Sequence, residues 1–143
     1  MPVNPIPDGY RTVTPYLVVG GVHRVLAFVT AAFGAEELRR TATPDGGVLN
    51  VELRIGDSTV MLVEARAGHD ASPASLYLYV ADADTVYARA VEGGGRALME
   101  PEDMFYGDRC AGVEDPAGTR WWIATRIEDL TPAELAARVA AKG

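Results

Sequence analysis

The fold is decided by residues 19–29, VGGVHRVLAFV, because their pattern returns 61 positions later at residues 80–90, VADADTVYARA. Each stretch runs from an apolar strand segment into apolar residues at helical spacing. Glycine follows both predicted helices, at Gly34 and at residues 93–95, and glycine commonly ends helices. The same offset pairs Tyr16 with Tyr77, Ile55 with Pro116, and residues 60–62 with residues 121–123. A repeat of this length predicts two tandem supersecondary modules.

Outward from these stretches, alternating apolar and polar residues predict the remaining strands. Residues 49–55 alternate with period 2, and a Gly56-Asp57 turn leads into a returning strand. Each module therefore has the order β-α-β-β-β, the first over residues 10–65 and the second over residues 74–127. Thr131, Pro132 and Glu134 form a capping box that predicts a helix over residues 131–141. The predicted fold class is α+β, in one domain over residues 1–143.

Composition narrows the classes of function. The net charge of −7 argues against a nucleic-acid partner, which needs a clustered basic face. No apolar run approaches the ~20 residues of a membrane span, and residues 1–7 lack the pattern of a secretory signal. Cys110 is the single cysteine, so an internal disulfide is excluded and a reducing interior is favoured. We therefore expect a cytoplasmic domain that binds a small molecule or a protein.

Six short phrases carry a resemblance to a known family. They are IPDGY at 6–10, VTPYL at 13–17, AFGAE at 32–36, GDR at 107–109, EDPAG at 114–118 and IAT at 123–125. Together they resemble the vicinal oxygen chelate superfamily of glyoxalases, bleomycin-resistance proteins and dioxygenases, and most of all its PhnB-like branch. The resemblance implies that the two modules form a curled mixed sheet with a central cleft. It also implies pairing of modules between chains, so we expect a homodimer.

The resemblance implies metal-ligand positions, which this chain fills unusually. In metal-using members, each module contributes one ligand from its first strand and one from its last. By strand position these sites fall on Thr14 and Ser75, and on Met61 and Trp122. Hydroxyl, thioether and indole groups do not hold divalent zinc, nickel or iron at useful affinity. The histidines His23 and His69 fall outside the cleft strands, so we expect neither a metal nor a cofactor.

The cleft positions indicate what such a site binds instead. Strand alternation directs a set of aromatic and amphipathic side chains to one face: Thr14, Tyr16, Met61, Ser75, Tyr77, Tyr79 and Trp122, with Glu52 and Arg54 from the third strand. This composition is typical of a pocket for a flat organic molecule. The alternative is that these side chains pack against each other or against a second subunit.

Several polar residues are weaker candidates. Glu52 and Arg54 are either solvated charges or, if enclosed, a general base and an anion contact. Phe105 belongs to a loop that either closes over the cleft, with Arg109 contacting an oxyanion or carboxylate, or is ordered by hydrogen bonds of Asp108 or Arg109. Cys110 is interpreted as a small buried residue.

Three functions compete at this point. The first is a metal-independent protein that binds an aromatic or hydrophobic compound, in a resistance or sequestration role. The second is a metal-independent lyase, isomerase or cyclase that acts through Glu52 and Arg109. The third is a divalent-metal enzyme with unusual ligands such as Glu52 and Asp108. A methyltransferase is not expected, because no glycine-rich loop for a methyl donor is present.

Overall fold

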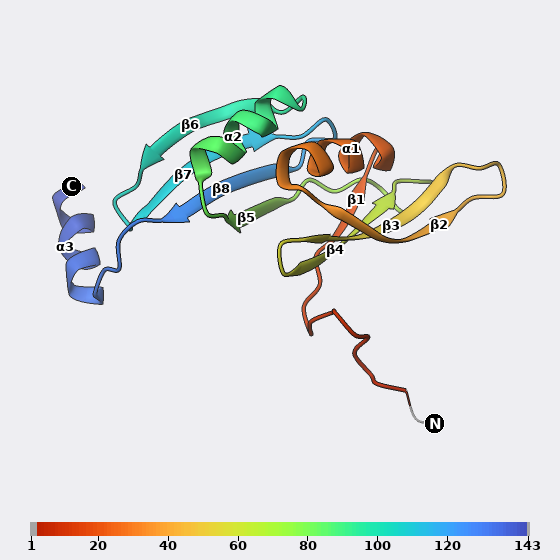
Figure 1. Ribbon diagram of the computed structural model, residues 1–143, viewed down its shortest axis with the longest axis horizontal. Helices are drawn as coiled ribbons and strands as arrows, with labels where there is room; N and C mark the ends of the chain where they lie inside the picture. The colour runs from red at the N-terminus through yellow and green to blue at the C-terminus, as the bar shows by residue number, and fades with distance from the viewer. Residues whose placement is uncertain (1–2, 143) are drawn as a thin grey trace.

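Two four-stranded sheets and three helices make up the fold in the computed structural model, which describes residues 3–142 (Figure 1). The first module contains β1 (Tyr16–Val19), α1 (Val22–Phe33), β2 (Glu36–Ala42), β3 (Val48–Ile55) and β4 (Ser58–Glu64). The second contains β5 (Ser75–Tyr79), α2 (Ala83–Glu92), β6 (Arg96–Asp103), β7 (Asp108–Glu114) and β8 (Arg120–Arg126). A final helix, α3 (Pro132–Lys142), follows the second module.

The two sheets have the same topology. Their strand orders are β1-β4-β3-β2 and β5-β8-β7-β6. In each sheet the first and last strands of the module pair in parallel, and the other neighbours are antiparallel. The predicted α+β class with two βαβββ modules and a short C-terminal helix is confirmed.

Strand register shows how closely the modules repeat. Tyr16 pairs with Met61 in β1–β4, and Tyr77 pairs with Trp122 in β5–β8, so both members are shifted by 61 residues. In the third strands the shift is 60, because Met61 pairs with Glu52 whereas Trp122 pairs with Gly112. The turn after β7 is longer than the turn after β3, which absorbs the difference. The sequence-based pairing of Ile55 with Pro116 is therefore wrong by one position.

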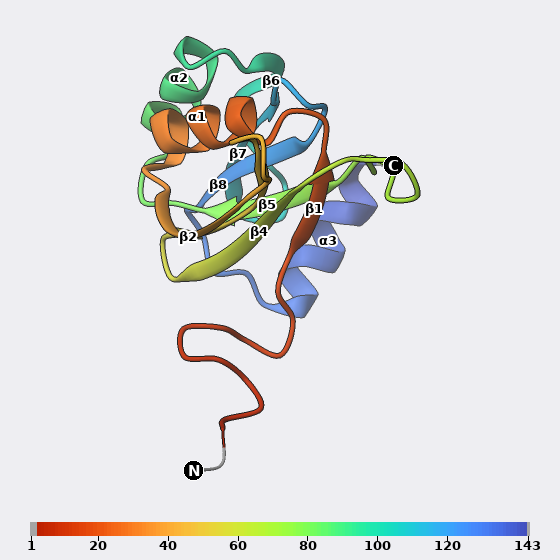
Figure 2. The same cartoon turned by 90° about the vertical axis from the view of Figure 1, so that its right-hand side faces the viewer.

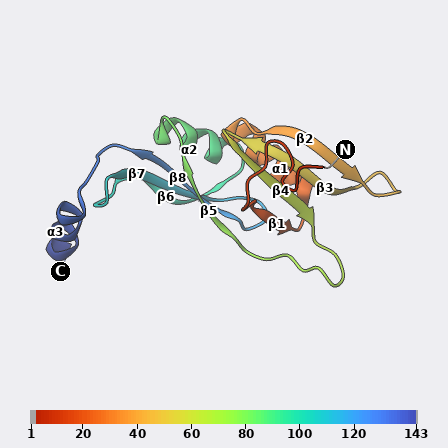
Figure 3. The ribbon, with the colours of Figure 1, turned by 90° about the horizontal axis from the view of Figure 1, so that it is seen from below.

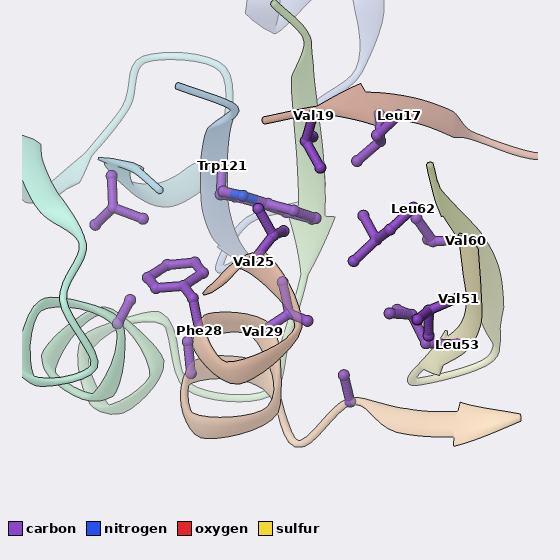
Figure 4. Packing of buried hydrophobic residues seen from close by; sticks show 14 of the residues in the cluster. Leu17, Val19, Val25, Phe28, Val29, Val51, Leu53, Val60, Leu62 and Trp121 are labelled. Atoms are coloured by element: carbon purple, nitrogen blue, oxygen red, sulfur yellow. The ribbon is translucent and has the colours of Figure 1, made fainter. Parts of the chain in front are cut away.

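The core lies between the helices and the inward faces of both sheets. α1 buries Val25, Phe28 and Val29 there, and α2 packs beside α1. From the second module, Trp121 reaches into the same cluster (Figure 4). Its ring also contacts the ring of Phe33. Burying each large apolar side chain contributes roughly 1.5–3 kcal/mol. One continuous core therefore joins the two modules.

Each helix begins at a polar cap, but the caps differ. Asp82 is the N-cap of α2, and Thr131 and Glu134 form the expected capping box of α3. α1 begins after Gly21, which has no side chain. There the carboxylate of Glu64, from β4, accepts the backbone N–H groups of Gly21 and Val22 at 2.8 and 2.9 Å.

Two segments lie outside the sheets. α3 stands at one end of the long axis and has no buried residue (Figures 1 and 3). It is held by a bidentate Arg138–Glu128 ion pair, with both distances 2.8 Å. Residues 3–15 form an arm on the side of the first sheet away from α1 (Figure 2). Over residues 3–142, no helix has the length and apolar content that crossing a bilayer requires.

Candidate functional site

The outward face of the first sheet, away from α1, is partly covered by the arm. The hydroxyl of Tyr10 donates to Glu52, and the backbone carbonyl of Gly9 accepts from Thr59 Oγ1 at 2.7 Å. A cavity of about 320 Å³ lies between the arm and the sheet. Its walls include Thr14, Glu52 and Met61, three of the residues predicted from the sequence. The structure therefore brings these three together, with the arm as an additional wall.

Glu52 is occupied rather than free. It accepts from Tyr10, and its Oε2 lies 3.7 Å from Arg39 Nε. The hydrogen bond to Glu52, together with burial, raises the pKa of Tyr10 above its ordinary value, so this phenol stays protonated and donating. Arg54, two residues further along β3, is exposed. Neither residue lies in an enclosed acid–base site.

Tyr16 contacts His69, a histidine in the segment that connects the two modules. Its hydroxyl lies 3.0 Å from His69 Nε2, and the two rings form an edge-to-face contact at 5.9 Å. A short turn, closed by paired backbone bonds between Arg66 and His69, presents the imidazole to the sheet. His69 was expected to face solvent, whereas the structure places it half-buried against Tyr16.

The outward face of the second sheet is aromatic. Ser75, Tyr77 and Tyr79 alternate outward along β5, and Tyr77 lies opposite Trp122. The Trp122 ring covers Gly112 so closely that an added Cβ would lie 2.4 Å from Cζ3. The position equivalent to Glu52 must therefore be glycine here for the indole to lie flat on the sheet. The sequence correctly placed these four predicted residues on one face.

At the edge of this aromatic face lies a buried carboxylate, Asp108, which the sequence suggested only as an unusual metal ligand or as a residue that orders its loop. Asp108 is 1% exposed. Its Oδ2 accepts from the hydroxyls of Tyr77 at 2.7 Å and Tyr79 at 2.9 Å, and the hydroxyl of Tyr106 lies 3.1 Å from that of Tyr77. The available signal was alternation along β7, which sends Asp108, Cys110 and Gly112 to the same face. We call Tyr77, Tyr79, Tyr106 and Asp108 the tyrosine–aspartate cluster.

A tight turn fixes Asp108 at the start of β7. Gly107 has φ +100°, and an added Cβ would lie 2.8 Å from the carbonyl oxygen of Glu128. The carbonyl of Gly107 in turn accepts from the amides of Ile127 and Glu128. Only glycine fits this conformation and spacing without strain. Backbone hydrogen bonds thus fix the position at which Asp108 leaves the turn and enters β7.

The phenols of the cluster are donors. Burial, followed by hydrogen bonds with Tyr106 and Asp108, raises the pKa of Tyr77 above its ordinary value. The bond to Asp108 is the largest cause of the raised pKa of Tyr79. Tyr106 shows the same direction, mainly because burial raises its pKa. All three hydroxyls therefore remain protonated at neutral pH.

Arg109 agrees with the second of the two alternatives given for its loop, a structural role, and not with the first, a ligand contact. Arg109 points to the opposite face of β7, where it pairs with Asp84 at 2.7 Å and Asp103 at 2.8 Å. These two carboxylates raise the pKa of its guanidinium. Strand alternation explains this orientation, since neighbours of an outward-facing Asp108 must face inward. Arg109 thus orders the fold and is not placed to contact a ligand in the cleft.

The loop that carries Phe105 is ordered by α3. The ring of Phe105 contacts that of Tyr106, and the ammonium of Lys142 lies 4.5 Å from its centroid. The carbonyl of Phe105 accepts from Arg138 at 3.1 Å. Cys110, as expected, is a small buried residue.

Within one chain, the predicted residues form two groups. Thr14, Glu52 and Met61 line the arm pocket, whereas Tyr77 and Tyr79 border a groove of about 580 Å³ along the open edge of β5. Opposite β5, this groove is bounded by the β3–β4 turn, and its floor includes Phe33 and Trp121. Over residues 3–142, no side-chain hydrogen bond joins one group to the other.

The residues at the metal-ligand positions do not fit a divalent ion. Thr14, Met61, Ser75 and Trp122 offer no imidazole or carboxylate, and such ions in proteins are held mainly by those groups and by thiolates. The described part of the chain contains no group of three or more histidine, cysteine, aspartate or glutamate side chains arranged to hold a metal. The donor chemistry therefore disagrees with the metal sites that the resemblance implies.

Comparisons with known proteins agree with this fold. The profile of the Glyoxalase/Bleomycin resistance protein/Dioxygenase superfamily matches residues 11–123. An uncharacterized Mycobacterium bovis protein, Mb0911c, is 32% identical over 141 residues, which cover 91% of this chain and 93% of that protein. Among solved structures, TioX from Micromonospora sp. ML1 has a TM-score of 0.69 at 20% identity, covering 82% of this chain and 99% of that chain.

A PhnB protein from Bacillus cereus, described as a putative 3-demethylubiquinone-9 3-methyltransferase, has a TM-score of 0.62 at 16% identity. The match covers 80% of this chain and 99% of that one. At these identities the two structural likenesses concern the fold alone. The profile match and the mycobacterial relative reach further, and both span most of the chain. The chain therefore belongs to the glyoxalase/bleomycin resistance protein/dioxygenase superfamily.

Proposed function

We propose that this chain is a metal-independent protein of the cytoplasm that binds an aromatic or hydrophobic small molecule and so sequesters it. The supporting observation is the contrast between the two kinds of cleft position. The positions that would ligate a metal carry Thr14, Met61, Ser75 and Trp122. The strands around them present exposed tyrosine rings and the Trp122 indole. Such a surface recognises rings by stacking and burial.

The proposal includes a homodimer, because each chain presents its candidate residues as two separate groups. β1 and β5 pair on one side only, so each has an open edge. The groove along β5 is lined by half-buried Leu76 and Leu78. Pairing of the first module of one copy with the second module of another would cover these edges and join the arm pocket to the aromatic face.

The two catalytic alternatives receive less support. Glu52 is paired with Tyr10, and Arg109 faces away from the outward side of its sheet. A lyase, isomerase or cyclase acting through both residues therefore lacks a shared site. Glu52 and Asp108 both already accept hydrogen bonds from tyrosine hydroxyls, so a metal centre built on that pair would have to displace those donors.

Titration calorimetry with three neutral ring compounds, indole, 1-naphthylmethanol and flavone, tests the proposal. We expect saturable binding of at least one of them, with one ligand for each chain. Tyr77→Ala and Trp122→Ala should weaken that binding, whereas Thr41→Ala, an exposed change on β2, should not. The absence of saturable binding by all three compounds would contradict the proposal.

A further inference from the structure

The carboxyl group of Asp108 is buried with one of its two oxygens left without a partner. Its Oδ2 accepts from two phenols, but its Oδ1 is buried and has no hydrogen-bond partner. Buried polar atoms in folded proteins nearly always have a partner, and an ionised carboxylate without a counter-charge is costly to bury. Asp108 is therefore an exception that calls for a functional explanation.

The two nearby arginines are engaged elsewhere. Arg109 points to the other face of β7 and binds Asp84 and Asp103. Arg126 is the direct cross-strand neighbour of Asp108, but its guanidinium donates to the carbonyl of Glu128 at 3.1 Å and lies 3.5 Å from Asp129. Within residues 3–142 neither arginine donates a hydrogen bond to Asp108, although Arg126 lies close enough to the Tyr79 hydroxyl to offset part of the rise in the pKa of Tyr79.

The rings around the carboxylate are accessible from outside. Tyr77 and Tyr79 are 44% and 60% exposed, and their ring centroids lie 5.4 Å apart in an edge-to-face contact. Both residues also border the 580 Å³ groove along β5. The raised pKa of both phenols keeps them as donors that hold the carboxylate in place. The carboxyl group of Asp108 thus lies at the hydroxyl ends of two exposed aromatic rings, on a strand that β8 separates from β5.

We propose that the tyrosine–aspartate cluster is a subsite for the protonated amino group of an aromatic amine whose ring lies against the exposed faces of Tyr77 and Tyr79. This deepens the proposed function, on which it rests. An ammonium group supplies the counter-charge and donors that Asp108 lacks. Aromatic faces attract cations, which adds to the preference. Because Oδ1 is covered, the ammonium group displaces one phenol hydroxyl on entry, and the exposed ring of Tyr79 is the one free to turn.

Three probes with one ring system separate charge from shape. We would titrate the protein with 1-naphthylmethylamine, 1-naphthylmethanol and 1-naphthoic acid by calorimetry at neutral pH. The amine should bind about tenfold tighter than the alcohol, and the acid should bind most weakly. Asp108→Asn should lower the affinity for the amine to that for the alcohol. Asp70→Asn makes the same change in net charge at an exposed linker position and should leave the preference intact.

A second pair of variants keeps the test valid if Asp108→Asn fails to fold. Tyr79 is the more exposed of the two β5 tyrosines, so its substitution should be tolerated. Tyr79→Leu removes the ring and should abolish most of the preference for the amine. Tyr79→Phe keeps the aromatic face and should retain it.

Arg126 provides the competing explanation. If Arg126 neutralised Asp108 in solution, Arg126→Gln would leave the carboxylate unpaired and lower the melting temperature as much as Asp108→Asn does. That result would overturn the proposal, as would equal affinities for amine and alcohol in the unmodified protein. Under the proposal, Arg126→Gln retains amine binding at full strength. Failure of all three probes to bind would instead contradict the proposed function itself.

Discussion

Gly112 shows how a single missing side chain shapes the aromatic face. An added Cβ would lie 2.4 Å from Cζ3 of Trp122, well inside contact distance. Gly112→Ala should therefore push the indole off the sheet and cost about 1–3 kcal/mol, as overpacking does. Chemical denaturation measures the loss, and the indole N–H signal of Trp122 in a two-dimensional NMR spectrum reports the displacement.

Gly20→Ala is the matched control for this change. No atom lies within 4 Å of a Cβ added at Gly20, and its backbone has no left-handed conformation. This variant should leave both stability and the Trp122 signal unchanged. An unmoved Trp122 signal in Gly112→Ala would mean that the ring does not lie on the strand as described.

For single residues, the sequence predicted which face of the sheet a side chain occupies better than it predicted its hydrogen-bond partner. Alternation placed Tyr77, Tyr79 and Trp122 outward correctly, because it depends only on neighbouring residues. The bonds from Tyr77 and Tyr79 to Asp108 span 31 and 29 positions, and they depend on which strands become neighbours in the sheet. The inward direction of Arg109 was, however, available from the same alternation once β7 is known to begin at Asp108.

Among the elements, α1 and α2 each begin at a side chain that accepts backbone N–H groups of the first turn. The two accepting residues occupy equivalent positions in the two modules but differ chemically. Glu64 accepts the amides of Gly21 and Val22, and Thr125, 61 residues later, accepts the amide of Ala83 at 2.9 Å. Glu64→Ala and Thr125→Val each leave a buried amide without an acceptor. Each should cost about 1–3 kcal/mol in the free energy of unfolding, measured by urea denaturation.

Thr41→Val serves as the control for the threonine change, because Thr41 is exposed on β2. The free-energy losses of Glu64→Ala and Thr125→Val should also add in the double variant, since these residues cap different helices. A cost in Thr125→Val no larger than in Thr41→Val would argue against its capping role.

α3 is the element whose attachment should depend on pH. Hydrogen bonds from Arg138 lower the pKa of Glu128 below its ordinary value of 4.5. A lowered folded-state pKa means that the pair stabilises docking above pH 4.5 and that this contribution is lost as pH falls through the lowered value. The protection factors of the α3 amides against hydrogen exchange should therefore fall in acid before those of the core strands do.

Glu128→Gln removes the titrating group. The protection factors of α3 should therefore be low already at neutral pH and show no further fall in acid. Glu92→Gln, an exposed change at the end of α2, should preserve the unmodified profile. Slow exchange of α3 throughout acid titration of the unmodified chain would contradict this account.

For the whole molecule, the repeated module was the most predictable feature. The grouping of the candidate site residues into an arm pocket and an aromatic face was the least predictable. The helices and strands follow from local periodicity and glycine positions, which each stretch of sequence carries by itself. The division of the candidate residues into an arm pocket and an aromatic face depends on how the sheets are arranged around the core. Residues 3–15 also form a wall of the arm pocket. The hydrogen bond from Tyr10 to Glu52 that holds this wall joins residues 42 positions apart, so local sequence patterns do not reveal it.

The proposed metal independence can be tested on the whole protein. Dialysis against EDTA should change neither the melting temperature nor the affinity for 1-naphthylmethanol, because no described side-chain cluster offers the donors of a divalent site. Elemental analysis of the purified protein should find far less than one zinc, nickel or iron per chain. Stoichiometric metal whose removal lowers affinity would contradict the proposed function.

The arm gives the pocket of the first module one wall that belongs to neither sheet. Gly9 and Tyr10 fasten it through single contacts to Thr59 and Glu52, while the core behind the sheet is built without it. Substitutions along residues 5–12 can therefore reshape the cavity with little penalty to folding. Ligand preference in such a protein is free to diverge quickly between lineages, whereas the framework that supports it is constrained to change slowly.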